Sequence, residues 1–161
     1  VDGVKTGHTE AAGYCLVASA MRDDMRLISV VLGTDSEKAR ADASAKLLNF
    51  GFRYYETRQL YASGEELTRA RIWKAEKPEI RMGIKDDVTV TIPRGDYKLM
   101  KAELEINEKI TAPVRQGDQM GKVIITLDGK TITTRPLVAL ETVNEGGIWT
   151  QLVDSIRLMA E

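Results

Sequence analysis

The sequence contains one cysteine, Cys15, and one histidine, His8, among its 161 residues. A single cysteine excludes an internal disulfide framework and a cysteine-based zinc site, and a single histidine excludes a multi-histidine metal site. No apolar run reaches the ~20 residues that a membrane-spanning helix requires. Neither sign of charge is in excess, since 23 Lys and Arg residues accompany 24 Asp and Glu residues. This balance argues against phosphate-driven binding of nucleic acid.

The remaining composition, with 43% hydrophobic and 29% charged residues, is that of an ordinary soluble globular protein. The length suits one domain or two small ones. The chain opens on Val1 without an initiator methionine or a signal peptide, which suggests proteolytic processing or a longer polypeptide of which only part is present here.

Residues 14–20 and 25–32 form two short, mostly apolar runs separated by the polar segment 21–24. This pattern predicts an antiparallel hairpin. Because both runs are almost continuously apolar, we expect the hairpin to be covered on both faces.

Residues 35–50 have the pattern of a helix that begins with a capping box, with Thr34 as the N-cap and Glu37 reaching back to it. Gly51 is expected to end it. The predicted apolar stripe consists of Ala39, Ala43, Leu47 and Phe50, widened by Leu48. One helix covers one face of the hairpin at most, so the other face lacks a partner in this chain.

Short alternating segments recur between residues 55 and 142, which predicts about seven strands and a small β-sandwich. The Asp128-Gly129 pair between two such segments is a strong hairpin signal. The alternating apolar residues are Ile80, Met82, Ile84, Val88, Val90, Ile92, Met100, Ala102, Leu104, Ile106, Val123, Ile125 and Leu127.

Residues 147–161 return to a helical, amphipathic pattern with Trp149 near its start. Two interpretations of this helix stay open. It packs against the β-rich region, or it begins an amphipathic anchor that lies in a membrane interface.

The first segment, Val1–Thr9, carries the chemically informative motif Lys5-Thr6-Gly7. On an edge strand, such a triplet presents a cation and a hydroxyl to a cleft, and the glycine lets a substrate backbone pair closely with the strand. The segment resembles the third active-site motif of serine penicillin-binding proteins, in particular the low-molecular-mass D-alanyl-D-alanine carboxypeptidases of the type-5 group. The resemblance covers the whole chain, through Ala12–Tyr14, Met25–Ser29, Arg40, Phe50–Arg53, Thr91–Gly95, Asp128–Ile132 and Arg135–Val138.

The resemblance implies a role for five residues. Lys5 would support proton transfer near the nucleophile, and the backbone N–H of His8 would be an oxyanion-hole donor. Thr6, Gly7 and Arg40 would bind the substrate, with the Thr6 hydroxyl and the Arg40 guanidinium directed at its terminal carboxylate.

The family's two other motifs, Ser-x-x-Lys and Ser-x-Asn, are absent: none of the six serines is followed by Lys at the third position or by Asn at the second. The chain alone is therefore predicted to be inactive. We expect an α+β chain in three parts. Residues 1–54 are the C-terminal part of a transpeptidase-like domain, residues 55–146 are a β-sandwich domain, and residues 147–161 are an amphipathic helix.

For the parent protein, the resemblance implies removal of the terminal D-Ala from peptidoglycan pentapeptides through a seryl acyl-enzyme that β-lactams also form. It implies no metal or organic cofactor, and a periplasmic location on the inner membrane surface, reached through the C-terminal helix. The N-terminal remainder of the catalytic domain would be a further partner. Two alternatives stay open: a non-catalytic β-sandwich module for positioning or protein contact, and a related serine enzyme. Among such enzymes, the all-β second half argues against a β-lactamase and leaves an endopeptidase open.

Overall fold

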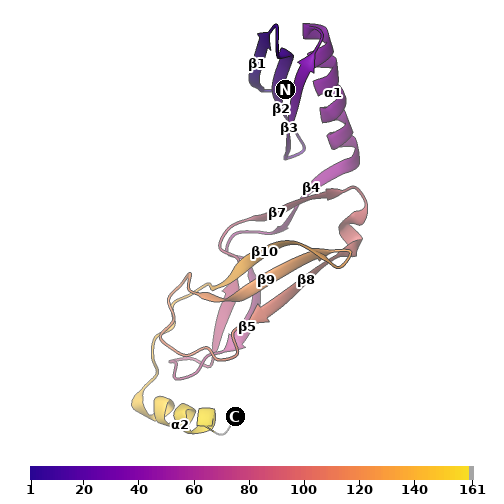
Figure 1. Ribbon diagram of the computed structural model, residues 1–161. Coiled ribbons are helices and arrows are strands. Elements are labelled where there is room, and N and C mark those ends of the chain that lie inside the picture. Colours follow the sequence, from indigo (N-terminus) through magenta and orange to yellow (C-terminus); the bar gives the residue numbers. More distant parts are fainter. Residues whose placement is uncertain (160–161) are drawn as a thin grey trace. The chain divides into compact units, whose positions relative to one another are not determined.

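The computed structural model describes residues 1–159, and its chain divides into two compact units (Figure 1). Unit 1 comprises residues 1–58 and 90–97. Unit 2 comprises residues 59–89 and the chain from Lys98 onward. The polypeptide therefore leaves unit 1, returns to it for eight residues, and leaves it again.

Unit 1 begins with a three-stranded antiparallel sheet of order β1-β2-β3. Its strands are β1 (Gly3–Thr9), β2 (Gly13–Arg22) and β3 (Met25–Thr34). The predicted hairpin is confirmed, and its turn is limited to Asp23 and Asp24, which both adopt positive φ, 48° and 61°. Two consecutive left-handed residues match the right-handed twist of the strands that they join.

Helix α1 (Glu37–Tyr54) differs from its prediction at both ends. Ser36 is the N-cap, because its hydroxyl accepts the Ala39 N–H at 3.1 Å, whereas Thr34 donates its hydroxyl to the Tyr14 carbonyl at 2.9 Å. The helix also continues through Gly51. A Cβ at Gly51 would lie 2.4 Å from Cδ1 of Leu27, so this glycine permits close packing on β3 rather than ending the helix.

The buried face of α1 includes Leu48 of the predicted stripe but not its Leu47 and Phe50. Ser44, Leu48 and Phe52 are buried, and the last two form a cluster with Ala18, Ala20 and Met25 of the sheet. Leu47 and Phe50 are 53% and 55% exposed. Leu47 and Phe50 were misplaced because the buried face contains Ser44, whose hydroxyl lies 2.9 Å from that of buried Ser29. This pairing satisfies both hydroxyls in the core.

The opposite face of β3 has no cover among the described residues. Ile28, Val30 and Leu32 are 66%, 57% and 69% exposed. Within residues 1–159, the hairpin is therefore not covered on both faces, and the expectation that one face lacks a partner is confirmed. Three adjacent large apolar side chains on one strand are an unusual surface for a soluble protein.

Unit 2 is built on a five-stranded antiparallel sheet of order β5-β6-β10-β9-β8 (Figure 1). Its strands are β5 (Glu66–Arg71), β6 (Glu79–Gly83), β8 (Met100–Ile106), β9 (Gln119–Leu127) and β10 (Lys130–Ala139). The other elements of the chain are the paired strands β4 (Tyr55–Tyr61) and β7 (Val88–Pro93), the 3-10 helix η1 (Asp96–Leu99) and helix α2 (Ile148–Met159). The mixed α+β class with a β-rich second half is confirmed.

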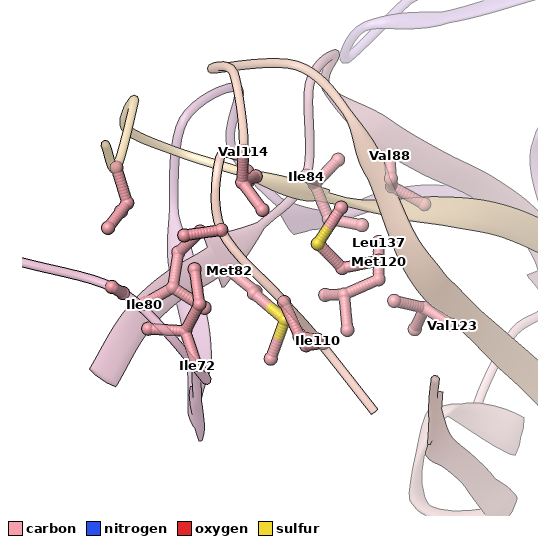
Figure 2. Close-up of a cluster of buried hydrophobic side chains, with 14 of the residues drawn as sticks. Ile72, Ile80, Met82, Ile84, Val88, Ile110, Val114, Met120, Val123 and Leu137 are labelled. Atoms are coloured by element: carbon pink, nitrogen blue, oxygen red, sulfur yellow. The ribbon is translucent and has the colours of Figure 1, made fainter. Parts of the chain in front are cut away.

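The core of unit 2 brings sheet and loop residues together (Figure 2). The fully buried sheet residues include Ile80, Met82, Val123 and Leu137. The loop residues Ile110, Ala112, Val114 and Val143 join the same cluster. The predicted alternation is confirmed in β6, β7 and β9.

The predicted alternation is wrong in β8, where Leu104 and Ile106 are 38% and 37% exposed. β8 is an edge strand of the five-stranded sheet, and only Met100 from its alternating set packs against the core. The predicted Asp128-Gly129 turn joins β9 to β10, with φ of 49° and 75° at its two residues.

Candidate active site

The Lys5-Thr6-Gly7 motif lies on β1, an edge strand of the sheet of unit 1. Every residue of β1 is exposed. The strand pairs with β2 in a register that places Thr6 opposite Leu16, Gly7 opposite Cys15 and His8 opposite Tyr14. The motif is thus presented on an open strand edge, as the sequence predicted, where an added strand could pair with it.

An open groove of about 490 Å³ lies beside β1 and β2. It is lined by Val1 and residues 3–6 from the β1 side, and by Leu16 and Ala18 of β2. Lys5 and Thr6 are therefore groove residues. The Lys5 ammonium donates to the Thr6 carbonyl oxygen at 3.0 Å, so its charge is held beside the motif's own backbone.

Gly7 leaves free space beside the strand. A Cβ built at this position would have no heavy atom within 4 Å, apart from its immediate chain neighbours. The absence of a side chain is therefore not required by packing within the described chain. It is the arrangement expected if a second backbone approaches the strand here.

Arg40 of α1 reaches this strand from 33 residues away in the sequence. Its Nη1 donates to the Gly7 carbonyl oxygen at 3.2 Å and to the Cys15 carbonyl oxygen at 3.5 Å. Its Nη2 lies 3.4 Å from Oε1 of Glu37, and the guanidinium carbon lies 5.5 Å from the centre of the Tyr14 ring. The Arg40 side chain is only 12% exposed as a result.

His8 is placed by a ring contact. The centres of the His8 and Tyr14 rings lie 4.0 Å apart, with 31° between the ring planes. Tyr14 thus lies between the histidine of β1 and the arginine of α1, and it contacts both.

The structure brings Gly7, His8 and Arg40 into one cluster, while Lys5 and Thr6 lie along the groove. Sequence reasoning missed Tyr14 and Glu37 as members of this cluster. The register between β1 and β2, which sets Tyr14 opposite His8, is the signal that could have found Tyr14. Within residues 1–159, no group of three or more His, Cys, Asp or Glu side chains is placed to hold a metal ion.

Two family models match the chain. Residues 55–145 match the family described as "Penicillin-binding protein 5, C-terminal domain". Residues 1–36, which contain the motif strand, match the family described as "D-alanyl-D-alanine carboxypeptidase". The two matches together identify the chain as the C-terminal portion of a D-alanyl-D-alanine carboxypeptidase of this group.

Individual relatives point to the same family. The chain is 43% identical to the D-alanyl-D-alanine carboxypeptidase DacC of Escherichia coli K12, over 98% of this chain and 40% of the relative. DacA of the same organism is also 43% identical, over 99% of this chain and 40% of the relative. The chain thus spans 40% of the length of these curated relatives. Among solved structures, penicillin binding protein 5 from Haemophilus influenzae matches with a TM-score of 0.81 and 41% identity, covering 89% of this chain and 42% of that one.

Proposed function

We propose that this chain works as the C-terminal part of a serine-type D-Ala-D-Ala carboxypeptidase that trims peptidoglycan pentapeptides. In this proposal, residues 1–54 complete the catalytic domain, residues 55–146 form the β-domain, and residues 147–161 form the terminal helix. The observation that carries it is the exposed Lys-Thr-Gly edge, where Lys5 and Thr6 line a groove and Gly7 leaves space for a second backbone. The names of the relatives support the same activity.

The chemistry is acyl transfer. A serine hydroxyl of the parent protein attacks the carbonyl carbon of the D-Ala-D-Ala bond, the terminal D-Ala leaves with a proton, and water then hydrolyses the seryl ester. The β1 edge binds the peptide as an added strand, and the His8 N–H donates to the oxyanion. The Lys5 ammonium favours proton transfer near the serine, and the Thr6 hydroxyl donates to the substrate's terminal carboxylate. Arg40 adds a positive charge behind Gly7.

The N-terminal remainder of the catalytic domain is the proposed cover for the bare face of β3. Ile28, Val30 and Leu32 together expose a continuous apolar stripe on that face. Its burial against the rest of the domain would contribute to stability in proportion to the area removed from water.

Labelling with a fluorescent penicillin tests the proposal, because a β-lactam acylates the same serine as the substrate. We expect the complete protein to be labelled, the Lys5→Ala variant to be labelled at least tenfold more slowly, and the 161-residue chain alone to stay unlabelled. Lys46→Ala, which removes an exposed lysine of α1, is the matched control and should label normally. A complete protein that takes up no label would refute the enzyme assignment. Release of free D-Ala from a pentapeptide, without cleavage of cross-linked peptides, distinguishes a carboxypeptidase from an endopeptidase.

We further propose that α2 holds the protein on the periplasmic face of the inner membrane. No helix of the described chain is both long and apolar enough to cross a bilayer. The polar side of α2 faces the rest of unit 2, and its Asp154 is buried there. Its apolar side is open, with Ile148 84%, Trp149 80% and Leu152 52% exposed. An outward apolar face with an aromatic residue is the pattern of a helix that lies in a membrane interface.

Co-sedimentation of the complete protein with vesicles tests this membrane role. Vesicles of phosphatidylethanolamine and phosphatidylglycerol should bind the wild-type protein, and Trp149→Glu with Leu152→Glu should abolish the binding because the open face becomes charged. Ile132→Glu is the control, since it places an acid at a similarly exposed apolar position of β10, where Ile132 is 40% exposed. Equal binding of the wild-type protein and the double variant would refute the proposal.

A further inference from the structure

Arg40 contacts one end of the peptide group whose other end is the His8 N–H. The carbonyl oxygen that Arg40 contacts at 3.2 Å belongs to Gly7, and the amide nitrogen of that same peptide bond belongs to His8. From this juxtaposition, and on the basis of the proposed function, we propose that Arg40 is a positioning residue. It holds the Gly7–His8 peptide group so that the His8 N–H points at the oxyanion.

The direction of the N–H follows from peptide geometry. The Gly7–His8 bond is trans, so its N–H points away from its C=O. Arg40 contacts the carbonyl from the side of β2, since the same Nη1 also reaches the Cys15 carbonyl of that strand. The His8 N–H is therefore directed away from β2, toward the open edge of β1.

Gly7 has no side chain to restrict this peptide group beyond the pairing of β1 with β2. Glycine has the widest range of backbone conformations, and no neighbouring atom surrounds the place where a Cβ would be. An external hydrogen bond to the Gly7 carbonyl removes part of this freedom. A charged donor on a carbonyl oxygen also polarises the amide, which strengthens its N–H as a donor.

Arg40 is itself held in place. Glu37 lies one helical turn earlier, with its Oε1 3.4 Å from Nη2 of Arg40. The guanidinium also lies over the Tyr14 ring. Tyr14 also contacts the His8 ring, so it touches both Arg40 and the residue that supplies the N–H of this peptide group.

These contacts favour action through Gly7 over direct binding of a substrate carboxylate. Nη1 of Arg40 donates to the Gly7 and Cys15 carbonyl oxygens and Nη2 contacts Glu37, so both terminal nitrogens have partners, and the side chain is only 12% exposed. A forked, two-bond grip on a carboxylate requires two free parallel donors that face solvent. The two roles make different kinetic predictions.

The test is hydrolysis of two peptides by the complete protein, one ending in free D-Ala-D-Ala and one with that terminus as its methyl ester. Arg40→Ala should lower kcat by roughly 10²-fold for both peptides, the loss typical of one oxyanion donor, and should leave KM within about threefold. Arg40→Lys retains a single charged donor and should recover part of the rate. Arg53→Ala, which removes an arginine stacked 5.6 Å from Tyr54 on the same helix, is the control and should keep full activity.

Folding of each variant is checked by the amide NMR spectrum of the complete protein. In Arg40→Ala, the His8 amide resonance should shift upfield as the polarising donor is lost, while resonances of unit 2 stay in place. A rate loss confined to the free acid and expressed in KM would overturn the positioning role in favour of carboxylate binding, and so would unchanged kinetics. A wild-type protein that cleaves neither peptide and takes up no penicillin would overturn the proposed function instead.

Discussion

The carboxylate of Asp154 on α2 accepts a hydrogen bond of 2.7 Å from the backbone N–H of Lys74, 80 residues earlier in the chain. Lys74 has a positive φ of 56°, in the short segment between β5 and β6. The same carboxylate lies 3.8 Å from Arg71, whose guanidinium covers the Trp73 ring at 3.7 Å. A polar contact therefore joins α2 to the rest of unit 2, while the apolar side chains Ile148, Trp149 and Leu152 remain exposed.

Asp154→Ala should release α2 from unit 2. Hydrogen bonds to charged groups contribute about 1.5–3 kcal/mol, and the variant leaves the Lys74 N–H without this partner. We expect the amides of α2 to exchange with deuterium at least tenfold faster, with little change in β9 and β10. Asp154→Asn retains an acceptor oxygen without the charge and should give an intermediate rate. Equal exchange in all three proteins would show that other contacts hold the helix.

Glu141 should make unit 2 sensitive to acid. Lys77 at 2.7 Å, together with the backbone N–H and guanidinium of Arg81, lowers the pKa of Glu141 from 4.5 to about 2. Because the folded-state pKa is the lower one, the contribution to stability is complete above about pH 4.5 and is lost as the pH falls toward 2.

Thermal unfolding from pH 7 to pH 2 measures this effect. The Tm of Glu141→Gln should lie below that of the wild-type protein at pH 7, and the difference should shrink steadily below pH 4.5. Glu103→Gln removes an exposed acid of β8 and should follow the wild-type curve. A Tm difference for Glu141→Gln that stays constant with pH would contradict the assignment.

Gly83→Ala should strongly destabilise unit 2. A Cβ at this position would lie 1.9 Å from the Glu65 carbonyl oxygen and 2.9 Å from Cδ1 of Leu140. The nearest atom is backbone and cannot rotate away, so we expect a loss of at least about 2 kcal/mol in the free energy of unfolding. Urea unfolding followed by the fluorescence of Trp73, which is 4% exposed, measures it. Gly147→Ala, which meets no atom within 4 Å, should change stability by less than about 1 kcal/mol.

Gly7→Ala should show the opposite behaviour. Its Cβ meets no atom of the described chain, so the stability should stay within about 0.5 kcal/mol of the wild-type value. Acylation of the complete protein by penicillin should slow by roughly 10²-fold, because the methyl group displaces the ligand backbone from the strand. Normal acylation kinetics in this variant would show that no ligand backbone lies against Gly7.

Local patterns predicted much of the fold. Strict alternation identified the buried residues of β6, β7 and β9, and Asp128-Gly129 placed the turn between β9 and β10. These predictions succeeded because side-chain direction alternates along any strand, and because a two-residue turn with positive φ requires such residues. The same alternation failed in β8, since a pattern does not say which strand is an edge.

The motif residues of the candidate site were predictable from the sequence, but Tyr14, Glu37 and the arrangement of the site were not. Lys5, Thr6 and Gly7 are adjacent in the sequence, and the motif alone indicates an exposed edge. The contact between Arg40 and the Gly7 carbonyl depends on the register of β1 with β2 and on which face of α1 meets the sheet. The apolar stripe predicted for α1 was right at Leu48 but wrong at Leu47 and Phe50, because the buried face includes the polar Ser44.

The sequence by itself determined the strands with clear alternation, the two helices, the tight turns and the identity of the motif residues. Each of these depends on the preferences of residues that are close together in the chain. Only the tertiary structure decided that Gly51 and Gly83 serve close packing, that α2 is seated by Asp154, and that Arg40 holds the carbonyl of Gly7. Those features join segments that are far apart in the sequence, so they depend on distances that no local pattern contains.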